Sequence, residues 1–182
     1  KTIEEVERDL NSKLLTDRLI CGEVGFGKTE VALRASFIAA YNSKQVCLLV
    51  PTTLLAQQHY ETFIERFKDF PIKIAKLSRD LSKKQRDLVI KDLKSGNIDI
   101  IIGTHAIFQE SVSFKKLVFV VIDEQHRFGV HQRLALTSKG KNIDILVMTA
   151  TPIPRTLTLT AYGDMEVSRL MEKPKGRLPI DT

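Results

Sequence analysis

The chain has 182 residues, of which 43% are hydrophobic and 27% are charged, and its net charge is +6. This size and composition suit one folded domain with a substantial core, and they exclude a low-complexity chain. No stretch approaches the ~20 consecutive apolar residues that span a bilayer, and no signal peptide is visible, so we expect a cytoplasmic protein without a membrane partner. The positive charge is compatible with a polyanionic partner but does not establish one.

Helical and extended patterns alternate along the chain. In chain order they predict a helix at 2–10, a strand at 18–21, a helix at 30–41, a strand at 46–50, a helix at 54–69, a strand at 72–77, a helix at 82–94, and strands at 98–102, 117–122 and 145–148. This alternation predicts an α/β fold of three layers, a mainly parallel sheet flanked by helices. Cys21 and Cys47 lie in predicted strands without metal-ligand spacing, so we expect buried free thiols.

The helix predicted at 82–94 is basic and amphipathic. Ser82 can cap its start, and Gly96 follows its end. We expect three of its apolar residues to face the core, namely Leu88, Val89 and Leu93.

The segment after the first predicted strand meets the phosphate-loop pattern G-x-x-x-x-G-K-[ST] in full. The predicted nucleotide-binding residues are Gly22, Glu23, Val24, Gly25, Phe26, Gly27, Lys28, Thr29 and Glu30. The glycines let backbone N–H groups turn toward phosphate oxygens, Lys28 supplies a charge for the β- and γ-phosphates, and the Thr29 hydroxyl can ligate Mg²⁺. A strand, a glycine-rich turn and a helix N-terminus together form an anion site. The alternative is a chance glycine-rich loop.

A second part of the predicted site closes the apolar run Val118–Ile122. Consecutive apolar residues predict a central strand that is buried on both faces. Asp123 and Glu124 then lie at its carboxyl end, where open α/β sheets bind ligands. We expect Asp123 to hold Mg²⁺ and Glu124 to polarise the attacking water, with Lys28 as the third catalytic residue. An ordinary acidic turn after a strand is the alternative.

Small or polar residues follow four of the predicted strands. They are Pro51-Thr52-Thr53, Gly103-Thr104-His105, Asp123-Glu124-Gln125-His126 and Thr149-Ala150-Thr151-Pro152. The carboxyl ends of parallel strands lie along one edge of a sheet, where hydroxyl groups suit phosphates of a nucleotide or of a nucleic-acid backbone. Threonines also cap helices, and for Thr52 or Thr53 alone capping is the stronger interpretation.

These segments resemble, in order and spacing, motifs I to III of the superfamily 2 helicases. The sequences at 123–130 and 148–157 resemble those of two families, the RecG-type branch-migrating DNA helicases and the transcription-repair coupling factors. Residues 17–79 are more similar to the coupling factors. Residues from about 98 onward, including Gln125 and 160–164, are more similar to the RecG type, which we favour.

The resemblance implies a RecA-like P-loop lobe that binds ATP and Mg²⁺ and drives movement on double-stranded or branched DNA in repair and recombination. By the matching motif positions, four residues would couple the nucleotide state to movement: Gln125, His126, Thr149 and Thr151. Matching positions near the DNA backbone are Thr52, Thr53, Thr104 and His105, and candidates for bridging to DNA or a neighbouring domain are Arg127 and Arg155. If the chain belongs to a coupling factor, RNA polymerase is a further partner.

The remaining basic residues and histidines are less specific. His126 could instead be a hydrogen-bonded core histidine, and we expect His59 and His131 to lie on helix surfaces. A basic group could contact DNA phosphates, although a solvated helix face fits it equally well: Arg79, Lys83, Lys84 and Arg86.

Helicases of this superfamily use two RecA-like lobes with ATP between them, and the motifs in this chain are those of the first lobe. We therefore expect residues 1–172 to form that lobe and residues 173–182, which contain two prolines and a glycine, to form a linker toward a second lobe of the same protein.

Two functions of other classes share parts of this pattern. A small-molecule kinase could use the same phosphate loop, but the Thr149–Pro152 segment and the absence of a substrate lid argue against it. A non-hydrolysing binding module derived from a motor is the other alternative, and the intact Lys28, Asp123 and Glu124 argue against lost chemistry.

Overall fold

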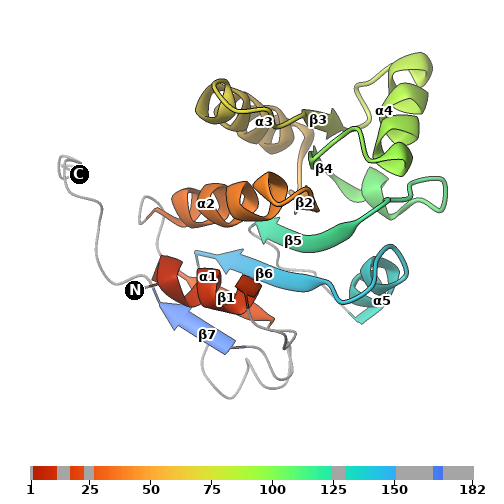
Figure 1. Cartoon of the computed structure of the whole chain (residues 1–182). Coiled ribbons are helices and arrows are strands. Elements are labelled where there is room, and N and C mark those ends of the chain that lie inside the picture. Colours follow the sequence, from red (N-terminus) through yellow and green to blue (C-terminus); the bar gives the residue numbers. More distant parts are fainter. Residues whose placement is uncertain (1, 12–16, 23–26, 124–129, 151–165, 170–182) are drawn as a thin grey trace, which may run out of the picture.

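Helices and strands alternate through the computed structural model, in which residues 2–11, 17–22, 27–123, 130–150 and 166–169 are described. The helices are α1 (Thr2–Asn11), α2 (Lys28–Tyr41), α3 (Thr53–Phe67), α4 (Lys83–Ser95), the 3-10 helix η1 (His105–Phe108) and α5 (Val130–Thr137). The strands are β1 (Arg18–Cys21), β2 (Gln45–Leu49), β3 (Ile74–Leu77), β4 (Ile100–Gly103), β5 (Leu117–Asp123), β6 (Asp144–Thr149) and β7 (Glu166–Arg169). Each predicted element is present within a few residues of its expected bounds (Figure 1).

The strands form one sheet in the order β3-β4-β2-β5-β6-β1-β7. All pairings within it are parallel, as the alternation of helices and strands predicts. Consecutive strands are not always neighbours, since the chain passes from β1 over β6 and β5 to reach β2. Three elements, η1, α5 and β7, are absent from the predicted series. Strand β7 has a single apolar residue in Glu-Val-Ser-Arg and gives no strand signal.

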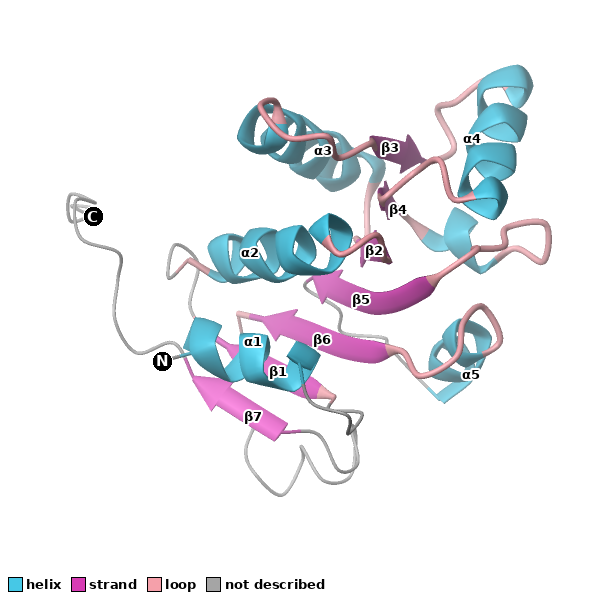
Figure 2. Cartoon of the chain, viewed as in Figure 1, coloured by secondary structure: helices cyan, strands magenta, loops and turns pink. Residues whose placement is uncertain are grey.

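Helices cover both faces of this sheet, which gives the predicted three layers (Figure 2). Helices α1, α2 and α3 pack on one face and contribute Val6, Val31, Leu33 and Phe63 to its core. Helices α4, η1 and α5 pack on the other, with Leu93, Ile107 and Leu136.

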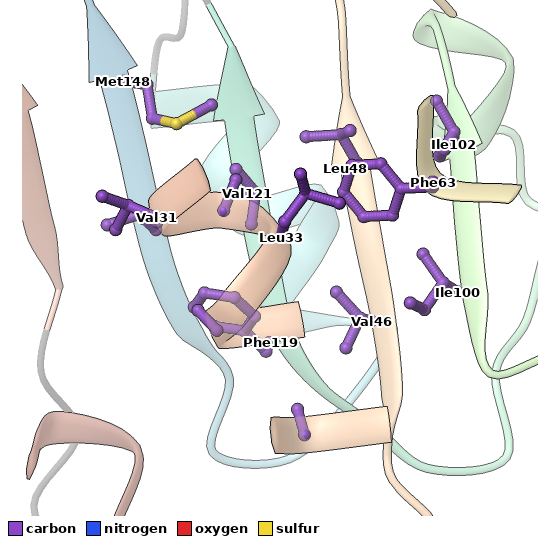
Figure 3. Packing of buried hydrophobic residues seen from close by; sticks show 14 of the residues in the cluster. Val31, Leu33, Val46, Leu48, Phe63, Ile100, Ile102, Phe119, Val121 and Met148 are labelled. Carbon is purple, nitrogen blue, oxygen red and sulfur yellow. The ribbon is translucent and has the colours of Figure 1, made fainter. Parts of the chain in front are cut away.

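Side chains alternate between these two cores along the central strands, because successive residues of a strand point to opposite faces. Val46 and Leu48 of β2 belong to the first core, and Cys47 and Leu49 belong to the second. Figure 3 shows the first core, where residues of α2 and α3 pack against side chains from β2, β4, β5 and β6. The strands therefore carry continuous apolar runs, as the sequence indicated for a sheet buried on both sides.

The ends of α4 follow the sequence prediction. The Ser82 hydroxyl accepts from the backbone N–H of Gln85, the Gln85 side chain accepts from the backbone N–H of Ser82, and Gly96 ends the helix with a φ of 81°. The prediction was wrong for Leu88, which is 53% exposed. Leu93 is buried and Val89 is half-buried, and Leu88 lies off the helix face on which they pack.

Both cysteines are buried free thiols, as predicted. Burial raises the pKa of the Cys47 thiol well above its ordinary range, so this thiol stays protonated and unreactive at neutral pH. Across the described part of the chain, no helix has the length and apolar character needed to cross a membrane.

Gly103 ends β4 at a point where the backbone of β3 and the Ile107 side chain of η1 lie close to its Cα atom. A Cβ atom at this position would lie 2.5 Å from the carbonyl oxygen of Leu77 and 2.7 Å from Cδ1 of Ile107. Both distances are shorter than van der Waals contact, so any larger residue would force β3 and η1 away from the end of β4.

We expect Gly103→Ala to lower the free energy of unfolding by about 1–3 kcal/mol, which is the usual cost of overpacking. Urea unfolding followed by circular dichroism measures this loss. Ser111→Ala, at an exposed position, is the matched control and should change stability by less than about 0.5 kcal/mol. Equal stability of the Gly103 variant and the parent chain would show that β3 and η1 can move apart freely.

Candidate nucleotide-binding site

The carboxyl ends of the parallel strands meet along one edge of the sheet. Cys21 of β1 pairs with Thr149 of β6, and the next residue, Gly22, donates its backbone N–H to the Thr149 carbonyl at 3.1 Å. Asp123 of β5 pairs with Met148 of β6. The parallel register therefore brings the phosphate-loop entrance, Asp123 and Thr149 to the same edge, as the sequence predicted.

The phosphate loop connects β1 to α2. Gly27 has a φ of 86° and caps the start of α2, and its carbonyl accepts from the backbone N–H of Glu30 at 3.1 Å. A left-handed conformation costs glycine little, which explains why glycine occupies this position. Lys28 and Thr29 then form the first turn of α2. The predicted contacts at Glu23, Val24, Gly25 and Phe26 lie outside the described residues and remain predictions.

The Lys28 side chain reaches back from α2 to the end of β1. The residue is 8% exposed, and its Nζ donates a hydrogen bond to the carbonyl oxygen of Gly22. Its ammonium group therefore lies between the end of β1 and the start of α2, at the positive end of that helix's dipole. A phosphate placed there would meet both the lysine charge and the positive end of the helix dipole.

Glu30 has a different environment from that expected of a nucleotide contact. Its carboxylate accepts from Nε of Arg34 at 2.9 Å, and Nη2 of Arg66 donates to both of its oxygens at 2.6 and 2.7 Å. Arg66 belongs to α3, so this side chain joins α2 to α3 close to the loop. A direct role for Glu30 in nucleotide binding remains a prediction.

Asp123 ends β5 with its side chain only 11% exposed. Its Oδ2 lies 2.7 Å from Nε2 of His59, a residue 64 positions earlier in α3. The expectation that His59 lies on a helix surface was therefore wrong, since the residue is only 8% exposed. Helix α3 buries one stripe against the sheet at Ala56, His59, Phe63 and Phe67. The signal in the sequence was the spacing of His59 from Ala56 and Phe63, which places it on the apolar face.

The described part of the chain includes Thr149 but not the other residues predicted to follow β5 and β6. Glu124, Gln125, His126, Arg127, Thr151 and Arg155 lie outside the described residues, and so does the side chain of His131. Thr149 is described and is 5% exposed at the carboxyl end of β6. The hydrolytic role of Glu124 and the coupling roles of its neighbours therefore remain predictions.

The residues predicted to lie near a DNA backbone share the site edge but differ in exposure. Thr52 and Thr53 are exposed at the start of α3, and His105 is exposed at the start of η1. Thr52 caps α3, because its hydroxyl accepts from the backbone N–H of Leu55 at 3.2 Å. Thr104 is 7% exposed, so its side chain offers little surface to a partner.

The basic group beyond this edge is mostly solvated. Arg79, Lys83 and Lys84 are exposed, whereas Nη2 of Arg86 donates to Oε1 of Gln109. Nearby, hydrogen bonds from Lys76 and then Ser78 hold the pKa of the Asp80 carboxyl below its usual range. The exposed basic side chains of this group therefore lie near the Asp80 carboxylate, which stays ionised.

The oxygen donors at the edge suit a magnesium nucleotide. Thr29 supplies a hydroxyl and Asp123 a carboxylate, and Mg²⁺ in nucleotide sites takes one or two protein oxygens together with phosphates and water. Among the described residues, no group of three or more His, Cys, Asp or Glu could hold a metal ion alone. The donor chemistry therefore fits a metal that arrives with phosphate ligands.

Comparison with known proteins agrees with this geometry. A family model described as DEAD/DEAH box helicase matches residues 3–160. The transcription-repair-coupling factors of Bacillus subtilis and Escherichia coli are 48% and 47% identical over all 182 residues, and the chain spans 16% of the length of each.

Solved structures show the same fold. The structure of RecG bound to a three-way DNA junction matches with a TM-score of 0.83 at 42% identity, over 97% of this chain and 24% of that one. The Hef helicase domain of Pyrococcus furiosus matches with a TM-score of 0.65 at 21% identity, over 86% of this chain and 35% of that one, which bears on the fold alone.

The cap at Thr52 gives a direct test of the local geometry. We expect Thr52→Ala to lower the free energy of unfolding by about 1 kcal/mol, because an orphan N–H of the first turn loses its acceptor. Urea unfolding measures the loss. Thr53→Ala, one residue further on, is the matched control and should leave stability nearly unchanged. Equal losses from the two variants would contradict the cap.

Proposed function

The chain belongs to the DEAD/DEAH box helicase family, and on that premise we propose that residues 1–172 form the first motor lobe of a translocase on double-stranded DNA. The lobe would act on branched DNA in recombination and repair, as a RecG-type helicase does. One observation carries the proposal: Lys28 at the start of α2 and Asp123 at the end of β5 share the carboxyl edge of a single parallel sheet. The 42% identity to a RecG bound to a DNA junction supports branched DNA as the partner.

Membership of this family implies that the lobe binds ATP. We assign the triphosphate to the loop from Gly22 to Thr29, with Lys28 exchanging its bond to the Gly22 carbonyl for phosphate oxygens. Thr29 and Asp123 would hold Mg²⁺, which neutralises charge that develops on the phosphates. Glu124 would orient the attacking water. Each role uses an oxygen or nitrogen donor that the sequence supplies in the expected order.

A second RecA-like lobe of the same protein is the first partner that we propose, joined through residues 173–182. In support, the chain spans 16% of the coupling factors and 24% of the RecG chain. That lobe would supply an arginine to the transferred phosphate, an effect worth about 10³–10⁵ in rate in related phosphoryl transfer. We further propose a cytoplasmic location, because the DNA of the bacteria that carry these coupling factors lies there.

A transcription-repair coupling factor is the second candidate. The identities of 48% and 47% to two such factors exceed the 42% to RecG, and this observation favours it. RNA polymerase would then be a further partner. A non-hydrolysing binding module is less well supported, because Lys28 and Asp123 keep the groups that the chemistry needs.

Two substitutions in the intact protein test the assigned roles. We expect Lys28→Ala to abolish ATP turnover, because the phosphates lose their cation. We expect Glu124→Gln to bind nucleotide like the parent protein while hydrolysis stops. Turnover is measured by phosphate release, and binding by fluorescence of a labelled ADP. Unchanged turnover in the Glu124 variant would remove this residue from the mechanism.

The isolated 182-residue chain provides a further test. We expect it to bind nucleotide weakly and to hydrolyse ATP slowly or not at all, because the second lobe contributes to the site. Phosphate release with and without a three-way DNA junction measures this, with the intact protein as the control. Stimulation of the isolated chain by the junction would show that one lobe suffices.

A further inference from the structure

A buried histidine lies behind the carboxylate assigned to Mg²⁺. His59 stands in the buried stripe of α3 between Ala56 and Phe63, both of which are fully buried. An apolar side chain is the usual occupant of such a position. A buried imidazole is costly unless its nitrogens are hydrogen-bonded, so the choice of histidine here calls for a partner.

That partner is Asp123. The distance of 2.7 Å between Nε2 of His59 and Oδ2 of Asp123 is short for an N–H···O hydrogen bond, as expected when the acceptor is charged. A carboxylate accepts hydrogen bonds, so this bond requires the His59 tautomer in which Nε2 carries the proton and donates it. Among the described residues, His59 is the hydrogen-bonding partner of the Asp123 side chain.

The bond engages one carboxylate oxygen and leaves the other for a different ligand. Outer-shell hydrogen bonds of this kind fix the orientation of a metal-binding carboxylate, and their loss commonly weakens metal affinity or activity by about 10–100-fold. With a side chain only 10% exposed, His59 has little freedom to turn away. The Asp123 carboxylate is therefore held in one rotamer before any ligand arrives.

Helix α3 is attached to the other half of the site as well. Two turns after His59, Arg66 donates to both oxygens of Glu30, which follows the phosphate loop in α2. A single helix thus contacts both the residue that ends β5 and the helix that begins at Lys28. The Arg66 pair is solvent-exposed and contributes little stability by itself, whereas the His59 bond is buried.

We propose that His59 is a positioning residue, which orients the Asp123 carboxylate for Mg²⁺ and joins the metal site to α3. The proposal rests on the proposed function, because it requires a magnesium nucleotide at this edge. It does not require DNA binding or the second lobe.

The test compares three variants of the intact protein. His59→Phe keeps a ring of similar size without a donor. His59→Gln keeps an amide N–H that can reach the same oxygen. Phe63→Leu disturbs the same buried stripe one turn further on and is the matched control for a loss of packing.

The main measurement is the binding of Mn²⁺, as a paramagnetic substitute for Mg²⁺, to protein saturated with a non-hydrolysable ATP analogue, followed by electron paramagnetic resonance. We expect His59→Phe to weaken Mn²⁺ binding by about 10–100-fold, whereas His59→Gln restores most of the affinity. Phe63→Leu should lower the urea midpoint without changing Mn²⁺ affinity. Binding of the analogue without metal should be the same in all four proteins.

Two results would overturn the inference: equal Mn²⁺ affinity in His59→Phe and the parent protein, or an equal loss in Phe63→Leu. Failure of His59→Gln to recover affinity would also count against it. If the parent protein itself bound neither the analogue nor Mn²⁺, the proposed function would fail first, and this outcome is distinct from the others.

Discussion

The proposed nucleotide site depends on the parallel pairing of β1, β6 and β5. Parallel strands place all of their carboxyl ends at one edge of the sheet, so this pairing alone brings residues from distant parts of the chain to the same edge. Here the pairing of Cys21 with Thr149 and of Asp123 with Met148 fixes the site to within one residue of register. A shift of one residue between β5 and β6 would turn Asp123 to the opposite face of the sheet.

Helix α3 adds a second constraint that the sheet alone does not provide. The sheet fixes the backbone position of Asp123, but the side chain of a residue at a strand end can still adopt several rotamers. His59 removes that choice from one side, and Arg66 ties the same helix to α2 near the loop. The helix that starts at the exposed Thr52 is thus part of the support of the nucleotide site and not only a cover for the sheet.

The sequence predicts most of this architecture, because local signals and burial agree in it. The apolar runs of β2, β4, β5 and β6 can be read directly, and the caps at Thr52 and Ser82 follow from residue type. The burial of His59 was not predicted, because a polar residue on an apolar helix face is buried only when it has a hydrogen-bonding partner. That partner, Asp123, is 64 residues away in the sequence.

Thr104 shows a related limit. Its motif correctly indicates the carboxyl edge of the sheet, but its exposure of only 7% depends on packing that residue types do not encode. Strand β7 was missed because its place is decided by pairing with β1 and not by its own composition.

If Lys28 binds phosphate as proposed, its bond to the Gly22 carbonyl affects how tightly a nucleotide would be held. The Lys28 ammonium group already donates a hydrogen bond to an acceptor within the protein. Nucleotide entry is then an exchange of acceptors, in which a neutral carbonyl is released and a charged phosphate oxygen takes its place. The net gain is the difference between two hydrogen bonds, which is smaller than the gain for an ammonium group that had no acceptor before. The same balance would ease the release of product, because the Gly22 carbonyl could accept the ammonium hydrogen bond again as the phosphate departs.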